Sequence, residues 1–115
     1  MKPPHLTPSI AVGDLVFTSG QLGRDEKGQI RGDISQQTRQ ALDNLECVLA
    51  DHELQLSDVV KTTAWLRSQT DLSNFNDVFA TVFGTHRPCR STVVSALARP
   101  EALVEIEAIA CKRPR

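Results

Sequence analysis

Two carboxylates stand two residues apart in an apolar run near the end of the chain. The run is VEIEAIA, residues 104–110, and the acids are Glu105 and Glu107. In an extended strand, side chains two residues apart point to the same face, so both acids share a face of a segment whose composition predicts partial burial. A half-buried carboxylate can serve as a general base or as one half of an ion pair.

Basic side chains that could meet these acids lie in two other β-rich runs. Lys61 and Arg67 belong to DVVKTTAWLR, and Arg90 begins RSTVVSALA. In one interpretation the acids form cross-strand ion pairs with these cations. In the other, one carboxylate and one arginine lie in a semi-dry cleft, where they bind and activate a small molecule. Strand alternation alone leaves both interpretations open.

The size and charge balance of the chain exclude several classes of protein. The 115 residues, 40 % of them hydrophobic, and the net charge of -1 are typical of one globular domain, residues 1–115. The 13 basic and 14 acidic side chains form no polybasic surface, and four Phe, one Trp and no Tyr offer few rings for stacking bases. Neither a membrane-spanning run nor a signal-peptide pattern is present. We therefore expect a cytoplasmic protein that binds neither nucleic acid nor membrane.

The cysteines predict neither a disulfide framework nor a metal site. Cys47, Cys89 and Cys111 are odd in number and widely spaced, which indicates reduced thiols. His86 and Cys89 are three residues apart, but no second pair of ligands follows at metal-site spacing.

The first half of the chain predicts a hairpin and a helix. SIAV and LVFTSGQ flank Gly13 and Asp14, as strands flank a tight turn, and the glycine-containing residues 23–32 predict a loop. Asp33 stands three residues before Gln36, as in a capping box, at the start of a helix of about five turns. The apolar stripe of this helix is Ile34, Ala41, Leu42, Leu45, Val48 and Leu49.

The second half predicts a strand, a helix and two further strands. DVVKTTAWLR alternates as a strand does, and a helix follows with Asp71 or Ser73 as its N-cap. RSTVVSALA and LVEIEAIACK are strands separated by a turn around Arg99 and Pro100. The order ββαβαββ predicts an α+β fold, a mixed sheet with two helices on one face. The second helix has its apolar stripe at Leu72, Phe75, Phe79, Val82 and Phe83.

Two helices cover only one face of such a sheet, so the other face must be explained separately. A face that carries Trp65, Val94 and Ile109 among charged groups is too apolar for water and too polar for a dry core. It suits a subunit interface with polar clefts. In the last strand, alternation directs one set towards the helices, Val104, Ile106, Ala108 and Ala110, and the other set away from them, Leu103, Glu105, Glu107, Ile109 and Cys111. In the two preceding strands, the residues expected to share a mixed apolar and charged face are Val59, Lys61, Thr63, Trp65 and Arg67, and Arg90, Thr92, Val94 and Ala96.

Five segments together resemble one protein family. They are FTSGQ (17–21), VVKTT (59–63), FNDVF (75–79), PCRSTV (88–93) and VEIEAIA, and in this order they are similar to the Rid family of reactive-intermediate deaminases, also called YjgF or L-PSP proteins. The likeness extends from about Gly13 to Arg113. It implies a chorismate-mutase-like homotrimer with ligand clefts between subunits. It also implies hydrolysis of 2-imino or 2-enamino acids to 2-keto acids and ammonia, without a cofactor.

The resemblance assigns roles to several residues of this chain. The family's arginine in P-x-R-S falls on Arg90, whose planar guanidinium suits bidentate binding of a substrate carboxylate. The family's acid in the final strand falls on Glu105, which would position or activate the attacking water. Glu105 is expected on the strand adjacent to that of Arg90, in a pocket covered by a second copy of the chain. The resemblance further implies substrate contacts by Ser19, Gly20, Asn76 and Thr92. In the alternative interpretation, Asn76 is an ordinary polar residue at the boundary of the apolar stripe of its helix.

Three departures from the family pattern concern the cleft. Well-studied members carry a cleft-lining tyrosine near the N-terminus, where this chain offers His5 or Leu6. The loop GTHRP before Arg90 is shorter than in the best-known branch. Cys89, beside Arg87 and Arg90, is either a thiol made reactive by nearby cations or a small packing residue at a strand start.

Two other functions remain open on the sequence. One is a non-catalytic trimeric regulatory protein that binds a small metabolite through Arg90. The other is the endoribonuclease or translation-inhibitor activity that the family's L-PSP name carries, which the acidic balance and scarce aromatic residues disfavour.

Overall fold

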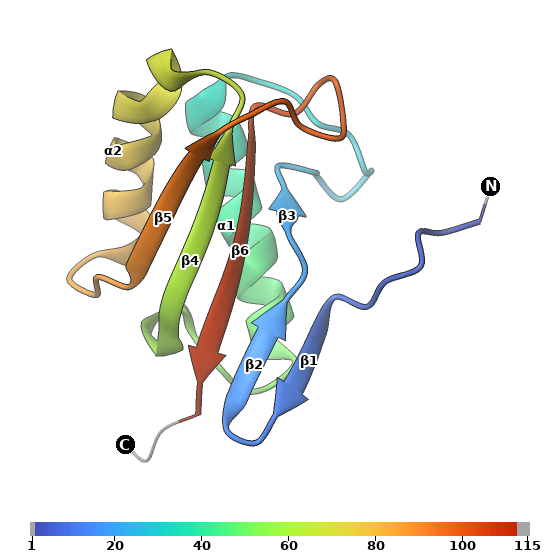
Figure 1. Cartoon of the computed structure of the whole chain (residues 1–115), viewed down its shortest axis with the longest axis vertical. Coiled ribbons are helices and arrows are strands. Elements are labelled where there is room, and N and C mark those ends of the chain that lie inside the picture. The colour runs from blue at the N-terminus through green and yellow to red at the C-terminus, as the bar shows by residue number, and fades with distance from the viewer. Residues whose placement is uncertain (1, 113–115) are drawn as a thin grey trace.

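The helices and strands follow one another in the predicted order, with one short strand added (Figure 1). A computed structural model describes residues 2–112; residue 1 and residues 113–115, including the predicted end of the family likeness at Arg113, lie outside it. Two short 3-10 turns occur directly before the strand at residues 59–66 and the helix at residues 72–83; they are Leu56–Asp58 and Gln69–Asp71. The strands are β1 (Ser9–Val12), β2 (Leu15–Thr18), β3 (Gln21–Leu22), β4 (Val59–Leu66), β5 (Cys89–Val94) and β6 (Val104–Cys111), and the helices are α1 (Ile34–Ala50) and α2 (Leu72–Phe83).

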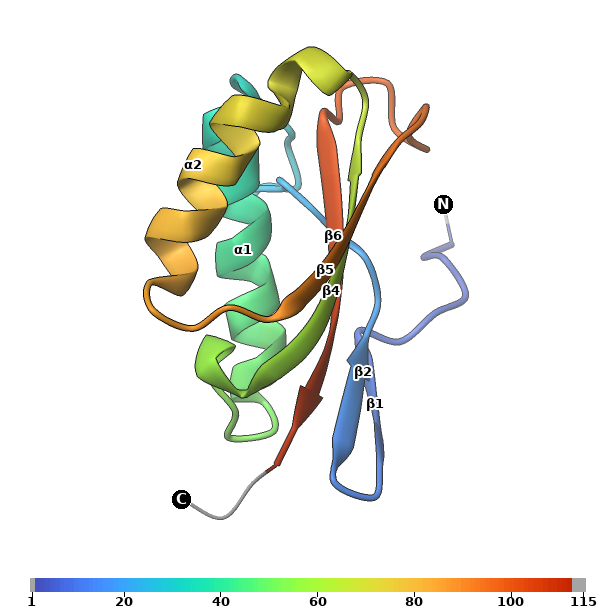
Figure 2. The same cartoon turned by 60° about the vertical axis from the view of Figure 1, so that its left-hand side comes forward.

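The sheet is mixed, and both helices lie on one of its faces (Figure 2). Its order is β1-β2-β6-β4-β5, with β3 also paired to β6. β4 and β5 run parallel because α2 returns the chain to the same end of the sheet, whereas β6 is antiparallel to β2, β3 and β4. The predicted α+β architecture is confirmed. One expectation is wrong: β4 lies between β5 and β6, so Arg90 and Glu105 are not on adjacent strands.

Helix α1 begins at the predicted capping box. The Asp33 carboxylate accepts a hydrogen bond of 2.9 Å from the Gln36 N–H, and the Gln36 side-chain oxygen accepts one of 2.9 Å from the Asp33 N–H. Helix α2 follows Asp71, one of the two predicted N-caps, but the Asp71 side chain makes no capping hydrogen bond. Instead the Ser68 hydroxyl caps the preceding 3-10 turn at the Thr70 N–H. None of the helices described has both the length and the apolar character needed to cross a bilayer.

The core lies between the helices and one face of the sheet. Val104, Ile106, Ala108 and Ala110 are at most 3 % exposed, as alternation predicts for β6. They belong to one hydrophobic core with the apolar stripes of both helices. The buried stripe residues are Ile34, Ala41, Leu42, Leu45 and Leu49 of α1 and Phe75, Phe79 and Phe83 of α2.

A β-bulge changes the face assignment that alternation predicts for β4. Val59 is opposite Ala110 and Lys61 is opposite Ile109, so the register shifts by one residue between them. Val59 consequently faces the core and is fully buried, whereas the prediction grouped it with Lys61. The shift is invisible in the sequence because it adds a residue without a glycine or proline.

The residues that alternation grouped together on β5, which include Arg90, Thr92 and Val94, also face the side of the sheet opposite to the predicted side. Thr62 pairs with Arg90 and Leu66 with Val94, and both β4 residues are buried beneath the helices. Arg90 and Val94 therefore point to the helix side of the sheet, at its edge, where α2 leaves Val94 50 % exposed. Val94 is not part of the uncovered face.

The uncovered face carries exposed apolar side chains on the N-terminal hairpin. Ile10, Val12, Leu15 and Phe17 are between 37 % and 59 % exposed. They continue the face on which Ile109 lies, because Phe17 pairs with both Ile10 and Ile109. A contiguous apolar face of this kind is typical of a protein interface.

Candidate functional site

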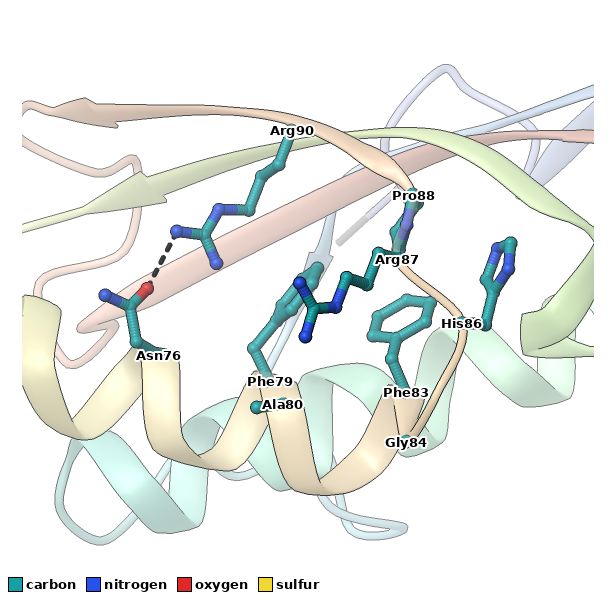
Figure 3. Close-up of a pocket in the computed structure, with 9 residues that line it drawn as sticks. All are labelled: Asn76, Phe79, Ala80, Phe83, Gly84, His86, Arg87, Pro88 and Arg90. Carbon is teal, nitrogen blue, oxygen red and sulfur yellow. Dashed lines mark hydrogen bonds between the residues drawn. The ribbon is translucent and has the colours of Figure 1, made fainter.

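Arg90 is held over aromatic rings and bonded to α2 at the edge of the sheet (Figure 3). Its Nη2 donates a hydrogen bond of 2.7 Å to Oδ1 of Asn76. Its guanidinium carbon lies 5.1 Å from the ring centroid of Phe75 and 4.9 Å from that of Phe79, within the range of cation–π attraction. Burial lowers the pKa of Arg90, although a guanidinium stays charged at physiological pH. The sequence-predicted residues Arg90 and Asn76 are thus in direct contact.

A cleft of about 490 Å³ opens beside Arg90, between α2 and the start of β5. Helix α2 contributes Asn76, Phe79, Ala80 and Phe83, which share one face because they are three or four residues apart. The connection to β5 contributes residues 84 and 86–88. No carboxylate is among the lining residues, so the described cleft is positively charged.

The connection that forms the far end of this cleft depends on a glycine. Helix α2 ends at Gly84, which has a φ of 66° and whose N–H bonds to the Ala80 carbonyl over 2.9 Å. A side chain is strained at such a positive φ, so glycine is the residue suited to this turn. His86 then bonds through Nε2 to the Val59 carbonyl over 2.6 Å, which requires that Nε2 carry the proton. This bond anchors the loop that leads to Arg90.

Glu105 lies on the opposite face of the sheet and is half-buried. It is opposite Trp65 on β4 and Leu22 on β3. Burial, and secondarily the nearby charge of Glu107, raise the pKa of Glu105. The ion pairs of residues 2–112 are Arg31–Asp25 and Arg99–Glu101, so neither acid of β6 is part of one.

The cations proposed as cross-strand partners of these acids have other partners. Lys61 donates to the Ser91 hydroxyl over 2.9 Å. The Arg67 guanidinium donates to the Ala102 and Arg99 carbonyls, each over 2.7 Å. Arg90 bonds to Asn76. The ion-pair interpretation of the two carboxylates is therefore wrong, and Glu105 is a half-buried carboxylate without an ion-pair partner in the described part of the chain.

Gly20 makes room for the Glu105 carboxylate. A Cβ at position 20 would overlap Oε2 of Glu105 and lie 2.8 Å from its carboxyl carbon. The glycine is at a break in the strand, where β2 ends and the Thr18 hydroxyl accepts a hydrogen bond of 3.0 Å from the Ala108 N–H. The resemblance implied a substrate contact at Gly20, and the group that approaches Gly20 within the chain is the acid of β6.

A second hollow, of about 300 Å³, contains Glu105, Gly20 and Leu6. Leu6, which is 65 % exposed, is one of the two residues that the sequence offered in place of the family's tyrosine, and it lines this hollow. Ser19 is nearby, but its hydroxyl donates to the Thr7 carbonyl and its N–H to the Pro8 carbonyl over 2.8 Å. Ser19 thus fixes the N-terminal segment beside Glu105.

The single chain does not bring Arg90 and Glu105 together. Arg90 faces the helix side at one edge of the sheet, and Glu105 is two strands away on the uncovered face. Thr92, on β5, faces the same side as Arg90 and is exposed. The predicted residues thus form two half-sites, an arginine half-site of Arg90 and Asn76 and a carboxylate half-site of Glu105 and Gly20.

Other residues of the cleft were not predicted as site residues. Phe79 and Phe83 carried only a helical packing signal, and Arg87 was noticed only as a neighbour of Cys89. Cys89 itself is exposed and is not among the residues that line the cleft, although Pro88 and Arg90 on either side of it are. No cluster of three or more potential metal ligands occurs among residues 2–112.

Comparison with known proteins gives matches along almost the whole described chain. A family model for endoribonuclease L-PSP matches residues 4–112. A RutC family protein of Pyrococcus horikoshii is 40 % identical over 106 residues, which is 90 % of this chain and 84 % of the relative. A 2-iminobutanoate/2-iminopropanoate deaminase of Escherichia coli is 33 % identical over 108 residues, with coverage of 90 % and 84 %. The solved structure of Escherichia coli TdcF with bound serine has a TM-score of 0.89 at 30 % identity and covers 98 % of this chain and 91 % of its own.

Replacing Glu107 by glutamine is expected to lower the pKa of Glu105. The negative charge of Glu107 opposes ionisation of its neighbour, so its removal favours the carboxylate form. A ¹³C NMR pH titration of the side-chain carboxyl groups would measure the change, with Glu46→Gln on the exposed face of α1 as the control. A Glu105 pKa that stays the same or rises in Glu107→Gln would contradict this electrostatic coupling.

Replacing Gly20 by alanine is expected to displace the Glu105 carboxylate without unfolding the protein. The new methyl group meets the end of a flexible side chain, which can rotate away. Gly23→Ala is the contrasting variant, because its Cβ would lie 2.7 Å from the backbone carbonyl oxygen of Gln37. Thermal denaturation should show a clear loss of stability for Gly23→Ala only, and a crystal structure of Gly20→Ala should show Glu105 moved. An unmoved carboxylate, or equal losses of Tm, would refute the assignment.

Proposed function

Because the chain belongs to the endoribonuclease L-PSP family, also called YjgF or Rid, we propose that it hydrolyses reactive 2-imino and 2-enamino acids to 2-keto acids and ammonia. The observation that carries the proposal is Glu105, a half-buried carboxylate with a raised pKa that contacts Gly20 and has no ion-pair partner among residues 2–112. A carboxylate in these surroundings is disfavoured as a structural ion and suited to accept a proton. The proposed enzyme needs no cofactor.

The proposed active site is formed between two subunits of a homotrimer. Arg90 and Glu105 cannot act on one small molecule within one chain, since they lie on opposite faces of the sheet. Glu105 shares its face with the exposed apolar residues Phe17 and Ile10. Burial of this face by a second copy would cover Glu105 and exclude bulk water. The β5 edge of that copy would then bring its own Arg90 and Asn76 to the carboxylate.

In the proposed reaction Arg90 binds and orients the substrate. Its guanidinium forms paired hydrogen bonds with the substrate carboxylate, while Asn76 and the rings of Phe75 and Phe79 fix the direction of the guanidinium. Thr92, on the same side of β5, and Ser19 and Gly20, beside the acid, are proposed to line the space around the substrate. A lysine at position 90 would keep the positive charge but could not form the same paired hydrogen bonds, so it would replace Arg90 only in part.

The ionised Glu105 then activates water. It accepts a proton as the water oxygen bonds to the iminium carbon, and the C=N π electrons pass to nitrogen to give a carbinolamine. Glu105 returns the proton to the amine nitrogen, and the C–N bond breaks as the hydroxyl oxygen becomes the carbonyl of the keto acid. The hydroxyl proton passes to the Glu105 carboxylate and then to the departing ammonia, which leaves as ammonium. A protonated imine is already electrophilic, so orientation and one base suffice. Because its pKa is raised, Glu105 loses the reactive form at a higher pH than an ordinary glutamate would.

The same residues also fit a protein that binds a small acid without turnover. The observation favouring this second candidate is the related TdcF structure, which holds serine rather than an imine. A binding protein would need Arg90 but no ionised Glu105. The family description also includes endoribonuclease, but the net charge of -1 and the few aromatic residues offer little to bind RNA.

Replacing Arg90 by alanine is expected to lower kcat/KM for imine hydrolysis about 100-fold, because it removes a charge-assisted, bidentate contact. Arg90→Lys should retain part of the activity, and Arg39→Ala, which removes an exposed arginine from α1, should behave as wild type. The assay measures keto-acid and ammonia release from 2-iminobutanoate generated by a dehydratase, above the spontaneous rate. Size-exclusion chromatography confirms that assembly is retained. Full turnover by Arg90→Ala would refute the proposal, and ligand binding by wild type without any turnover would select the binding protein.

A further inference from the structure

The cleft beside Arg90 contains a second guanidinium that the proposed reaction does not use. Arg87 is in the connection between α2 and β5, and its side chain extends into the cleft towards Phe79 and Phe83 (Figure 3). Since β5 begins only at Cys89, strand alternation does not fix the direction of Arg87. The structure therefore reveals what the sequence pattern could not, that Arg87 and Arg90 line the same cleft.

Neither cation is neutralised by an acid of the described chain. The ion pairs among residues 2–112 involve neither Arg87 nor Arg90, and no carboxylate lines the cleft. Arg90 donates to the side-chain amide of Asn76, which is neutral. Arg90 is half-buried and Arg87 is exposed at the same cleft. Two like charges that line one cleft repel each other, and a ligand with two negative groups removes that repulsion.

The cleft extends along α2 from Asn76, the partner of Arg90, to Phe83, which is two helical turns or roughly 10 Å further along the axis. Arg90 enters it from β5, and Arg87 enters it from the preceding loop. Phe79 and Phe83 contribute apolar rings to the same cleft. The volume of about 490 Å³ is in the range of ligand sites and far exceeds the needs of a four-carbon monocarboxylate held at the Arg90 end.

We infer that this cleft selects substrates with a second acidic group on the side chain, the 2-imino dicarboxylates and the 2-keto dicarboxylates that they yield. Arg90 and Asn76 bind the carboxylate next to the imine, Arg87 pairs with the distal carboxylate, and the intervening methylene groups lie over Phe79 and Phe83. The inference rests on the proposed function, because that function assigns the first carboxylate to Arg90. Arg87 is then the residue that determines substrate specificity.

Binding of two stable keto acids tests the inference without catalysis. 2-Oxoglutarate and 2-oxopentanoate have the same five-carbon skeleton and differ in a terminal carboxylate against a terminal methyl group. Isothermal titration calorimetry of the assembled protein should show that wild type binds 2-oxoglutarate at least about tenfold more tightly, with a preference that weakens as salt is added. Arg87→Ala should lose this preference and bind 2-oxopentanoate within about twofold of wild type. Arg87→Lys should restore part of it, and Arg39→Ala, the matched charge control, should not change it.

The inference is overturned by equal binding of the two keto acids by wild type, by equal weakening of both by Arg87→Ala, or by no measurable binding of either. Inorganic phosphate, which has the charge but not the length, should compete poorly; competition as strong as that of 2-oxoglutarate would also overturn it.

Hydrolysis of the two corresponding imines separates this inference from the proposed function. If neither imine is hydrolysed but 2-oxoglutarate binding depends on Arg87, the assignment of Arg87 to the distal carboxylate stands as a ligand preference only, and the deaminase proposal fails. If the monocarboxylic imine is hydrolysed and Arg87→Ala changes neither substrate selectively, the deaminase proposal stands and the inference about Arg87 fails.

Discussion

Two helices cover one face of the sheet in this fold, and the properties of the chain follow from the face that they leave open. The helix-covered side buries the alternate residues of β6 completely, so the intervening residues must point outward. Among those are Glu105 and the half-buried Ile109, and the exposed Phe17 and Leu15 continue the same surface. An acid on a surface that is mostly apolar remains ionised only at some energetic cost, which is the origin of its raised pKa.

The two half-sites differ in how firmly the chain organises them. Arg90 is fixed by a hydrogen bond to Asn76 and by two aromatic rings, all from α2, so the direction of its guanidinium is set within the single chain. Glu105 is restrained mainly by the packing of its carboxylate against Gly20 and by its strand neighbours. An apolar residue at position 105 would remove the half-buried charge, and under the proposed function it would also remove the base that activates water.

The sequence predicted the elements and much of the face pattern because both depend on local periodicity. The capping box at Asp33, the aromatic stripe of α2 and the inward set of β6 are confirmed. The position of β4 between β5 and β6 and the bulge after Val59 could not be predicted, since strand order and register are set by long-range pairing. Arg87 was overlooked for a related reason: a loop residue has no periodicity, and only the packing of its loop against α2 directs it into the cleft.

The central claim, that Arg90 of one subunit acts with Glu105 of another, is tested most directly by mixing two inactive variants. Arg90→Ala and Glu105→Gln subunits are unfolded together in equal amounts, refolded and assayed for imine hydrolysis, with the two variants refolded separately as the background. In a cyclic trimer each site takes its arginine and its acid from different subunits, so about a quarter of the sites should regain both and activity should return to about a quarter of wild type. Activity that stays at the background in assembled, mixed trimers would contradict the shared site.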